Sequence, residues 1–272
     1  MSRISLVLIV LFFVALPLAA QTDASQQQEP ASAAGLQEAP PAIQLLPLDT
    51  TPPDKLEDQG DNLRARSMYL DALDSYRAAI AKKPSAVLYN KLGITEIQLR
   101  RTSDALTAIN RAIHMQRGYA DAWNNRGSVY YLEGNYRRAG KDFEHAIKLN
   151  DQNASFHSNL GSAYFNEHHL DKASQEYQIA LRLDPLVFER SSKSGIEALM
   201  GKPSDHAEFE YLMAKLYAQS GDLSDALLHL RKAIEEGYKA INNVYKDQEF
   251  ATVRTDQRFK DLMAQKPEGI PQ

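Results

Sequence analysis

Small and large apolar residues recur along the chain at a fixed spacing. Ala72, Ala105, Ala139 and Ala173 are separated by steps of 33, 34 and 34 residues. In each copy a large apolar residue follows the alanine after four positions, and a second alanine follows it after seven. Apolar positions three and four residues apart are typical of one face of a helix. The pattern therefore predicts pairs of helices that repeat about every 34 residues, which is the signature of a repeat protein.

Turn-forming residues fall at matching places in this pattern. Glycines precede the repeated alanine by twelve positions in three copies: Gly93, Gly127 and Gly161. The pairs Gly134-Asn135 and Gly221-Asp222 predict a helix that ends in a left-handed glycine, followed by a helix that Asn or Asp caps. Pro84 and Pro185 are expected to close the second helix of their repeats, because proline cannot continue a helix interior.

The pattern resembles the tetratricopeptide repeat family. Trp123, Gly127 and Tyr130 occupy the W-x3-G-x2-Y frame of that family, and residues 157–185 form a second, almost complete copy. The resemblance implies an all-α fold, a right-handed superhelical solenoid of antiparallel helix pairs. We expect the copies at residues 53–85, 86–119, 120–153, 154–187 and 207–240. The alternative is an ordinary helical bundle, but a bundle has no reason to keep the same residue types in register over four copies.

The resemblance also implies where a partner binds. In this family the first helix of each repeat lines a concave groove that takes extended or helical peptides. The positions that map to this groove are Asn90, Lys91, Ile94, Ile97, Asn124, Asn125, Ser128, Tyr131, Ser158, Asn159, Ser162 and Phe165. Asparagine both donates and accepts hydrogen bonds, so it can pair with a peptide backbone, and the rings of Tyr131 and Phe165 can take apolar side chains. The alternative is that these residues form a solvated polar face.

Some family members grip a C-terminal carboxylate with Lys and Arg on successive first helices. Lys91 is the only basic residue among the groove positions of this chain. A carboxylate clamp is therefore not expected.

The N-terminal residues have the pattern of a secretory signal peptide. Arg3 precedes an apolar run over residues 4–16, and the small pair Ala19-Ala20 follows. We expect residues 1–20 to be cleaved off. The alternative is an uncleaved anchor helix, which would be the chain's only contact with a membrane. Residues 21–52 are rich in Gln, Ala, Pro and Ser, and we expect a disordered linker there.

Two further segments fall outside the repeats. Residues 188–206 interrupt the period, and we expect a short inserted helix or linker that ends at Gly201-Lys-Pro203. In residues 241–272 two near-duplicates follow each other, Asp247-Gln-Glu-Phe250 and Asp256-Gln-Arg-Phe259. In each, we expect the Asp to cap a short helix and the Phe to pack inward. The tail would then cap the last repeat, whose apolar face needs a cover.

Composition excludes several kinds of function. The chain has no cysteine, so it forms no disulfide. Its formal net charge is −4 and its basic residues form no block, so nucleic acid is not an expected partner. The sequence contains no H-E-x-x-H, no G-x-S-x-G and no phosphate loop, and we expect no catalytic residue, cofactor or metal. His168-His169 fall at a predicted turn, where a solvated pair is the simplest interpretation.

The sequence thus predicts an exported, periplasmic or secreted scaffold or adaptor of the cell envelope. Its predicted partner is a peptide segment of an envelope protein. A membrane-anchored assembly factor, an envelope enzyme and a glycan-binding module are the alternatives. The enzyme would need a convergent set of acid, base or metal-binding residues, and a single tryptophan gives the glycan-binding module little support.

Overall fold

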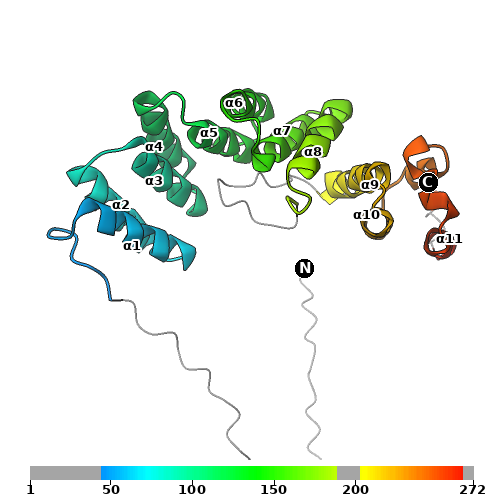
Figure 1. The fold of residues 1–272 in the computed structure, drawn as a ribbon, viewed down its shortest axis with the longest axis horizontal. Helices are drawn as coiled ribbons and strands as arrows, with labels where there is room; N and C mark the ends of the chain where they lie inside the picture. The colour runs from blue at the N-terminus through cyan, green and yellow to red at the C-terminus, as the bar shows by residue number, and fades with distance from the viewer. Residues whose placement is uncertain (1–43, 189–202, 266–272) are drawn as a thin grey trace, which may run out of the picture. The chain divides into compact units, whose positions relative to one another are not determined.

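A computed structural model describes residues 44–188 and 203–265 (Figure 1). Within these ranges every regular element is a helix, as predicted. The predicted signal peptide lies outside the described residues. The α-helices are α1 (Pro53–Ala65), α2 (Tyr69–Lys82), α3 (Ala86–Gln98), α4 (Thr102–Met115), α5 (Ala120–Leu132), α6 (Tyr136–Leu149), α7 (Ala154–Asn166), α8 (Leu170–Leu183), α9 (Pro203–Ser220), α10 (Leu223–Glu235) and α11 (Gln257–Ala264). Three 3₁₀-helices, η1 (Ile241–Tyr245), η2 (Gln248–Phe250) and η3 (Val253–Thr255), precede α11.

The helices pack as successive hairpins. Each odd-numbered helix from α1 to α9 packs mainly against the helix that follows it, and each of the first four hairpins packs against the next one. The first four hairpins run from Pro53 at the start of α1 to Leu183 at the end of α8. The fifth differs at its start, because α9 begins at Pro203 rather than at the predicted residue 207. The predicted inserted helix falls largely on residues 189–202, which lie outside the described ranges.

Each of the first four hairpins has a glycine where its two helices cross. A Cβ atom added to Gly127 would lie 2.6 Å from Cε1 of Phe143, which is fully buried on the second helix of the same hairpin. Gly161 and Tyr177 repeat this contact at 2.6 Å. Gly60 stands at the same place in α1, 2.5 Å from the ring of Tyr76. The first hairpin therefore contains the same close approach of two helices, although its first helix lacks most of the sequence pattern of the others.

The turns inside the hairpins use the left-handed conformation. Gly134 and Gly221 have φ angles of 75° and 85°, as predicted from the glycine pairs. Asn135 and Asp222 then cap α6 and α10 through their side-chain oxygens. Non-glycine residues take the same conformation at the equivalent turns of the other hairpins, and they are Ser67, Arg100 and His168, with φ between 58° and 61°.

The segment before α1 lies against the first hairpin. The Leu46 amide donates to Oε1 of Gln59 at 2.6 Å, and Nζ of Lys82 donates to the carbonyl oxygens of Asp49 and Thr51 at 2.7 Å each. A disordered linker was expected up to residue 52. For residues 44–52 the structure instead has an ordered segment, because its backbone finds donors and acceptors on α1 and α2.

The tail covers the end of the last hairpin. Phe250 and Phe259 are 0% and 3% exposed, as predicted for inward-packing rings. Asp256 caps α11 by accepting from the amide of Arg258 at 2.8 Å. Asp247 makes no cap hydrogen bond; it accepts instead from the hydroxyl of Tyr211 at 3.0 Å. Among the described residues, no helix is both long and apolar enough to span a bilayer.

Candidate partner-binding surfaces

The predicted groove asparagines meet one another between neighbouring hairpins. Nδ2 of Asn125 on α5 donates to Oδ1 of Asn90 on α3 at 3.0 Å. Nδ2 of Asn159 on α7 donates to Oδ1 of Asn124 on α5 at 2.9 Å. Two consecutive links of the same kind therefore tie the first helices of three hairpins together. We call the four residues the asparagine ladder.

The other predicted groove residues are also mostly buried. Except for half-buried Lys91, all of them are at most 8% exposed, including Tyr131 at 3% and Phe165 at 2%. The hydroxyls of Ser128 and Ser162 donate to backbone oxygens four residues earlier in their own helices. The hydroxyl of Tyr131 accepts from Nδ2 of Asn166 at 2.8 Å. Partner binding by these residues remains a prediction, and in this structure their main contacts are with neighbouring helices.

Lys91 is held by two carboxylates of the first hairpin. Its Nζ lies 2.6 Å from Oε1 of Glu57 and 2.6 Å from Oδ2 of Asp61. Burial lowers the pKa of Lys91, but the hydrogen bonds with Asp61 and Glu57 outweigh that effect, and the pKa is raised. Lys91 therefore links α3 to α1 as a charged group with two partners, which continues the contacts between first helices toward the N-terminus.

A more accessible surface lies where α8 meets the last hairpin. A groove of 540 Å³ lies beside Leu181 of α8 and Leu216 of α9. Its other lining residues are Gln178, Arg182, Pro185, Leu186, Tyr217, Gln219, Ser220, Asp222 and Asp225. We call it the junction groove. Leu186 is 37% exposed, so a large apolar side chain is open to solvent there.

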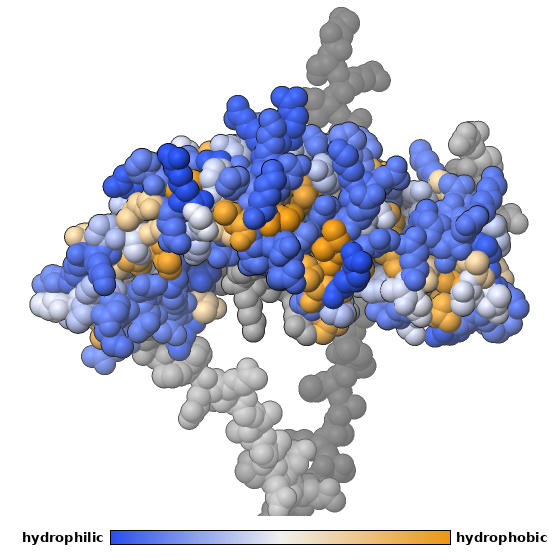
Figure 2. All heavy atoms as spheres, turned by 45° about the horizontal axis from the view of Figure 1, so that its top comes forward, coloured by the Kyte–Doolittle hydropathy of each residue, from blue (hydrophilic) through white to orange (hydrophobic). Residues whose placement is uncertain are grey.

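The sequence pattern does not predict the junction groove. Its two sides come from residues 178–186 and 216–225, which residues 189–202 separate in sequence. The inserted segment breaks the period at this place, so the repeat register does not show which side chains face each other. The break in the repeat period at residues 188–206 was the one feature of the sequence that could have pointed to this surface. Figure 2 shows a mainly hydrophilic surface in which hydrophobic residues gather in separate patches.

A succession of helical hairpins, the first four of which cross at a glycine, defines a helical repeat protein. Residues 120–153 match the family model described as Tetratricopeptide repeat. A TPR repeat-containing protein of Rhizobium etli is 32% identical over 57 residues, which are 21% of this chain. The matched residues are only 28% of the length of that relative.

One solved structure shows the same fold. The structure of Pseudomonas aeruginosa pilF matches with a TM-score of 0.53 and 17% identity, over 79% of this chain and 97% of that one. A thermophilic TPR protein of Thermus thermophilus matches with a TM-score of 0.48 and 20% identity, over 78% and 99% of the two chains. The family match over residues 120–153 and the helical repeat fold of the described residues support a tetratricopeptide repeat protein.

Proposed function

We propose that this protein is a non-catalytic scaffold that binds a segment of a partner protein. The repeat fold supports this function, because stacked helical hairpins offer extended surfaces for other proteins. The single observation that carries the proposal is the junction groove, an apolar depression with an exposed leucine in an otherwise mainly polar surface.

The lining of the junction groove indicates what it binds. Leu181, Leu186 and Tyr217 offer apolar contacts of the kind that hold anchor residues at interfaces. Asp222 and Asp225 supply two carboxylates to the lining, against one guanidinium from Arg182. The proposed occupant is therefore a peptide segment with one or two large apolar side chains next to a Lys or Arg.

In this proposal the predicted first-helix residues stabilise the scaffold and do not contact the partner. The asparagine ladder fixes the spacing of α3, α5 and α7, and so it holds the surface that the hairpins present. Direct binding by Asn125, Tyr131, Asn159 and Phe165 is the competing possibility, and the same experiment tests it.

The experiment first identifies a partner by crosslinking in an envelope extract with residue-level mapping. Binding is then measured with purified partner for Leu186→Asp and for Leu149→Asp. Leu149 is a matched control, because it is 41% exposed near the end of α6 and does not line the junction groove. We expect Leu186→Asp to weaken binding at least tenfold, about 1.4 kcal/mol, and Leu149→Asp to leave it unchanged.

Two results would contradict this assignment of the site. Equal affinity of both leucine variants for the partner would show that the binding site lies outside the junction groove. Loss of binding in the quadruple alanine variant of Asn125, Tyr131, Asn159 and Phe165, with helices intact by circular dichroism, would place it on the first helices.

We further propose that the protein is exported and works in the cell envelope. The support is the sequence of residues 1–20, with its basic start, apolar run and small-residue exit. Mass spectrometry of the protein expressed with these residues should find a mature chain that starts at Gln21. An intact Met1 in the membrane fraction would favour the anchored form instead.

A further inference from the structure

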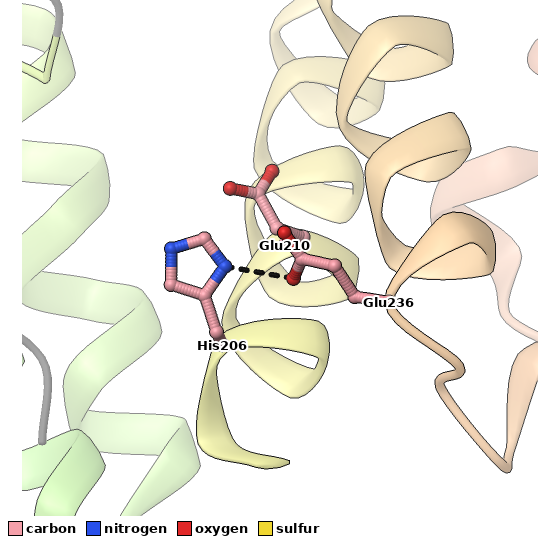
Figure 3. A group of neighbouring side chains, drawn as sticks. All are labelled: His206, Glu210 and Glu236. Carbon is pink, nitrogen blue, oxygen red and sulfur yellow. Dashed lines mark hydrogen bonds and ion pairs between the residues drawn. The ribbon is translucent and has the colours of Figure 1, made fainter. Parts of the chain in front are cut away.

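Three potential metal ligands meet at one end of the last hairpin (Figure 3). His206 and Glu210 lie four residues apart on α9, so their side chains share a face of that helix. Glu236 directly follows α10. One ligand atom from each of the three residues lies within 4.8 Å of the others, and Nδ1 of His206 is 2.7 Å from Oε2 of Glu236.

Glu210 is the fixed member of this group. It is only 4% exposed, and its Oε2 accepts a hydrogen bond from Nδ1 of His229 at 2.6 Å. The ring of His229 stacks on Tyr217, with centroids 5.0 Å apart and planes 9° apart. A carboxylate held by such a partner keeps its orientation, as metal ligands with an outer hydrogen bond do. Nζ of Lys232 lies 3.8 Å from the same oxygen, so a positive charge also faces the Glu210 carboxylate.

His206 and Glu236 are the adjustable members. Both are exposed, so their side chains can rotate toward a common centre without disturbing the core. Zinc takes imidazole nitrogen and carboxylate oxygen at about 2.0–2.2 Å, and three protein ligands leave a fourth position open. An ion would replace the proton between His206 and Glu236, and these two side chains would turn with it toward the fixed carboxylate of Glu210.

We propose that His206, Glu210 and Glu236 bind one divalent transition-metal ion of the zinc type. The bound ion would join the first turns of α9 to the end of α10. It would therefore stabilise the last hairpin. The inference does not depend on the proposed function, since the junction groove is lined by other residues.

Isothermal titration of the untagged, chelator-treated full chain with Zn²⁺ tests the proposal. We expect one ion per chain and a raised melting temperature, because a ligand that binds the folded state stabilises it. His206→Ala and Glu236→Gln should each lower the affinity at least tenfold and abolish the thermal shift. Both residues are exposed, so these variants are expected to fold, which circular dichroism can check.

The matched control is His114→Ala, an exposed histidine on α4 outside the group. It should bind Zn²⁺ as the wild type does. Equal affinity of the His206 and Glu236 variants and the wild type would overturn the proposal. Absence of heat and of any thermal shift in the wild type up to about 1 mM Zn²⁺, a level that detects even weak sites, would overturn it as well.

Discussion

The middle hairpins and the last hairpin share their secondary structure but differ in how they join their neighbours. From α3 to α7, first helices are linked by paired asparagine side chains. At the junction of α8 and α9, the links are aromatic rings. Phe209 of α9 lies 6.0 Å from Phe165 and 5.6 Å from Tyr177 between ring centroids, in edge-to-face geometry.

The asparagine links stop before α9 because α9 carries different residues at the equivalent positions. Counted from the repeated alanine, Leu212 of α9 stands where α7 has Asn159. A leucine cannot continue a ladder of amide hydrogen bonds. The polar groups of α9 turn to the tail instead: Nζ of Lys215 lies 3.2 Å from carboxylates of Asp247 and Glu249. Contacts between hairpins thus vary along the chain.

Contacts inside the hairpins vary less. His157 and Glu176 pair at 2.7 Å in the fourth hairpin, and Glu210 and His229 pair at 2.6 Å in the fifth. Both pairs are 19 residues apart, with the two residue types exchanged. The hairpin is therefore the more constant unit of this fold, and the joint between hairpins is the more variable one.

The largest expected effect comes from emptying the core of a middle hairpin. Phe143 is fully buried over Gly127, whereas Phe209 at the junction is half-buried. Phe143→Ala should lower the free energy of unfolding by roughly 3–5 kcal/mol. Phe209→Ala should cost less, about 2 kcal/mol, since less surface returns to water. Urea unfolding of both variants checks this, and equal losses would show that the junction is packed as tightly as the repeats.

The asparagine ladder provides the next test. Asn125→Ala leaves the buried side-chain oxygen of Asn90 without this donor. The expected loss is about 1–3 kcal/mol. In a double-mutant cycle, Asn90→Ala should then cost much less in the Asn125→Ala background. Additive losses would mean that the 3.0 Å contact contributes nothing to joining α3 and α5.

A substitution in one of the turns should have a smaller effect, and it should stabilise the protein. His168 has φ of 58°, and Gly221 occupies the equivalent turn of the last hairpin with φ of 85°. His168→Gly should stabilise the protein by about 0.5–1 kcal/mol, because the left-handed conformation costs a residue with a Cβ more than it costs glycine. Thermal unfolding measures the gain. Gly221→Ala is the reciprocal variant and should lose a similar amount.

The smallest expected effect depends on pH. Burial lowers the pKa of His157, but the hydrogen bond with Glu176 and that with the Asp151 carbonyl raise it more, and the pKa lies above its usual value. The charged pair therefore stabilises the fold fully below about pH 6.5. This stabilisation is lost as the pH rises through the raised pKa. Between about pH 6 and 8 the wild type should lose more free energy of unfolding than His157→Gln does, as measured by urea titration. Parallel pH curves would contradict the assignment.

The sequence by itself determined the hairpins. The period of the alanines, the glycine twelve residues before them and the capping pairs at the turns all act within one hairpin. Local backbone preference and a 3.6-residue apolar pattern are enough to specify such a unit. For this reason α1 to α8 form four successive hairpins, and Gly60 shows that even the weak first copy has the same close approach of its two helices.

Only the tertiary structure decided what covers each helix face. A polar face looks the same in sequence whether water or the next hairpin covers it, so Asn124 and Asn125 were expected in a groove and are found buried in a ladder. The junction groove and the group of His206, Glu210 and Glu236 likewise join side chains from different helices. Their positions depend on how hairpins and tail pack together, which no local pattern specifies.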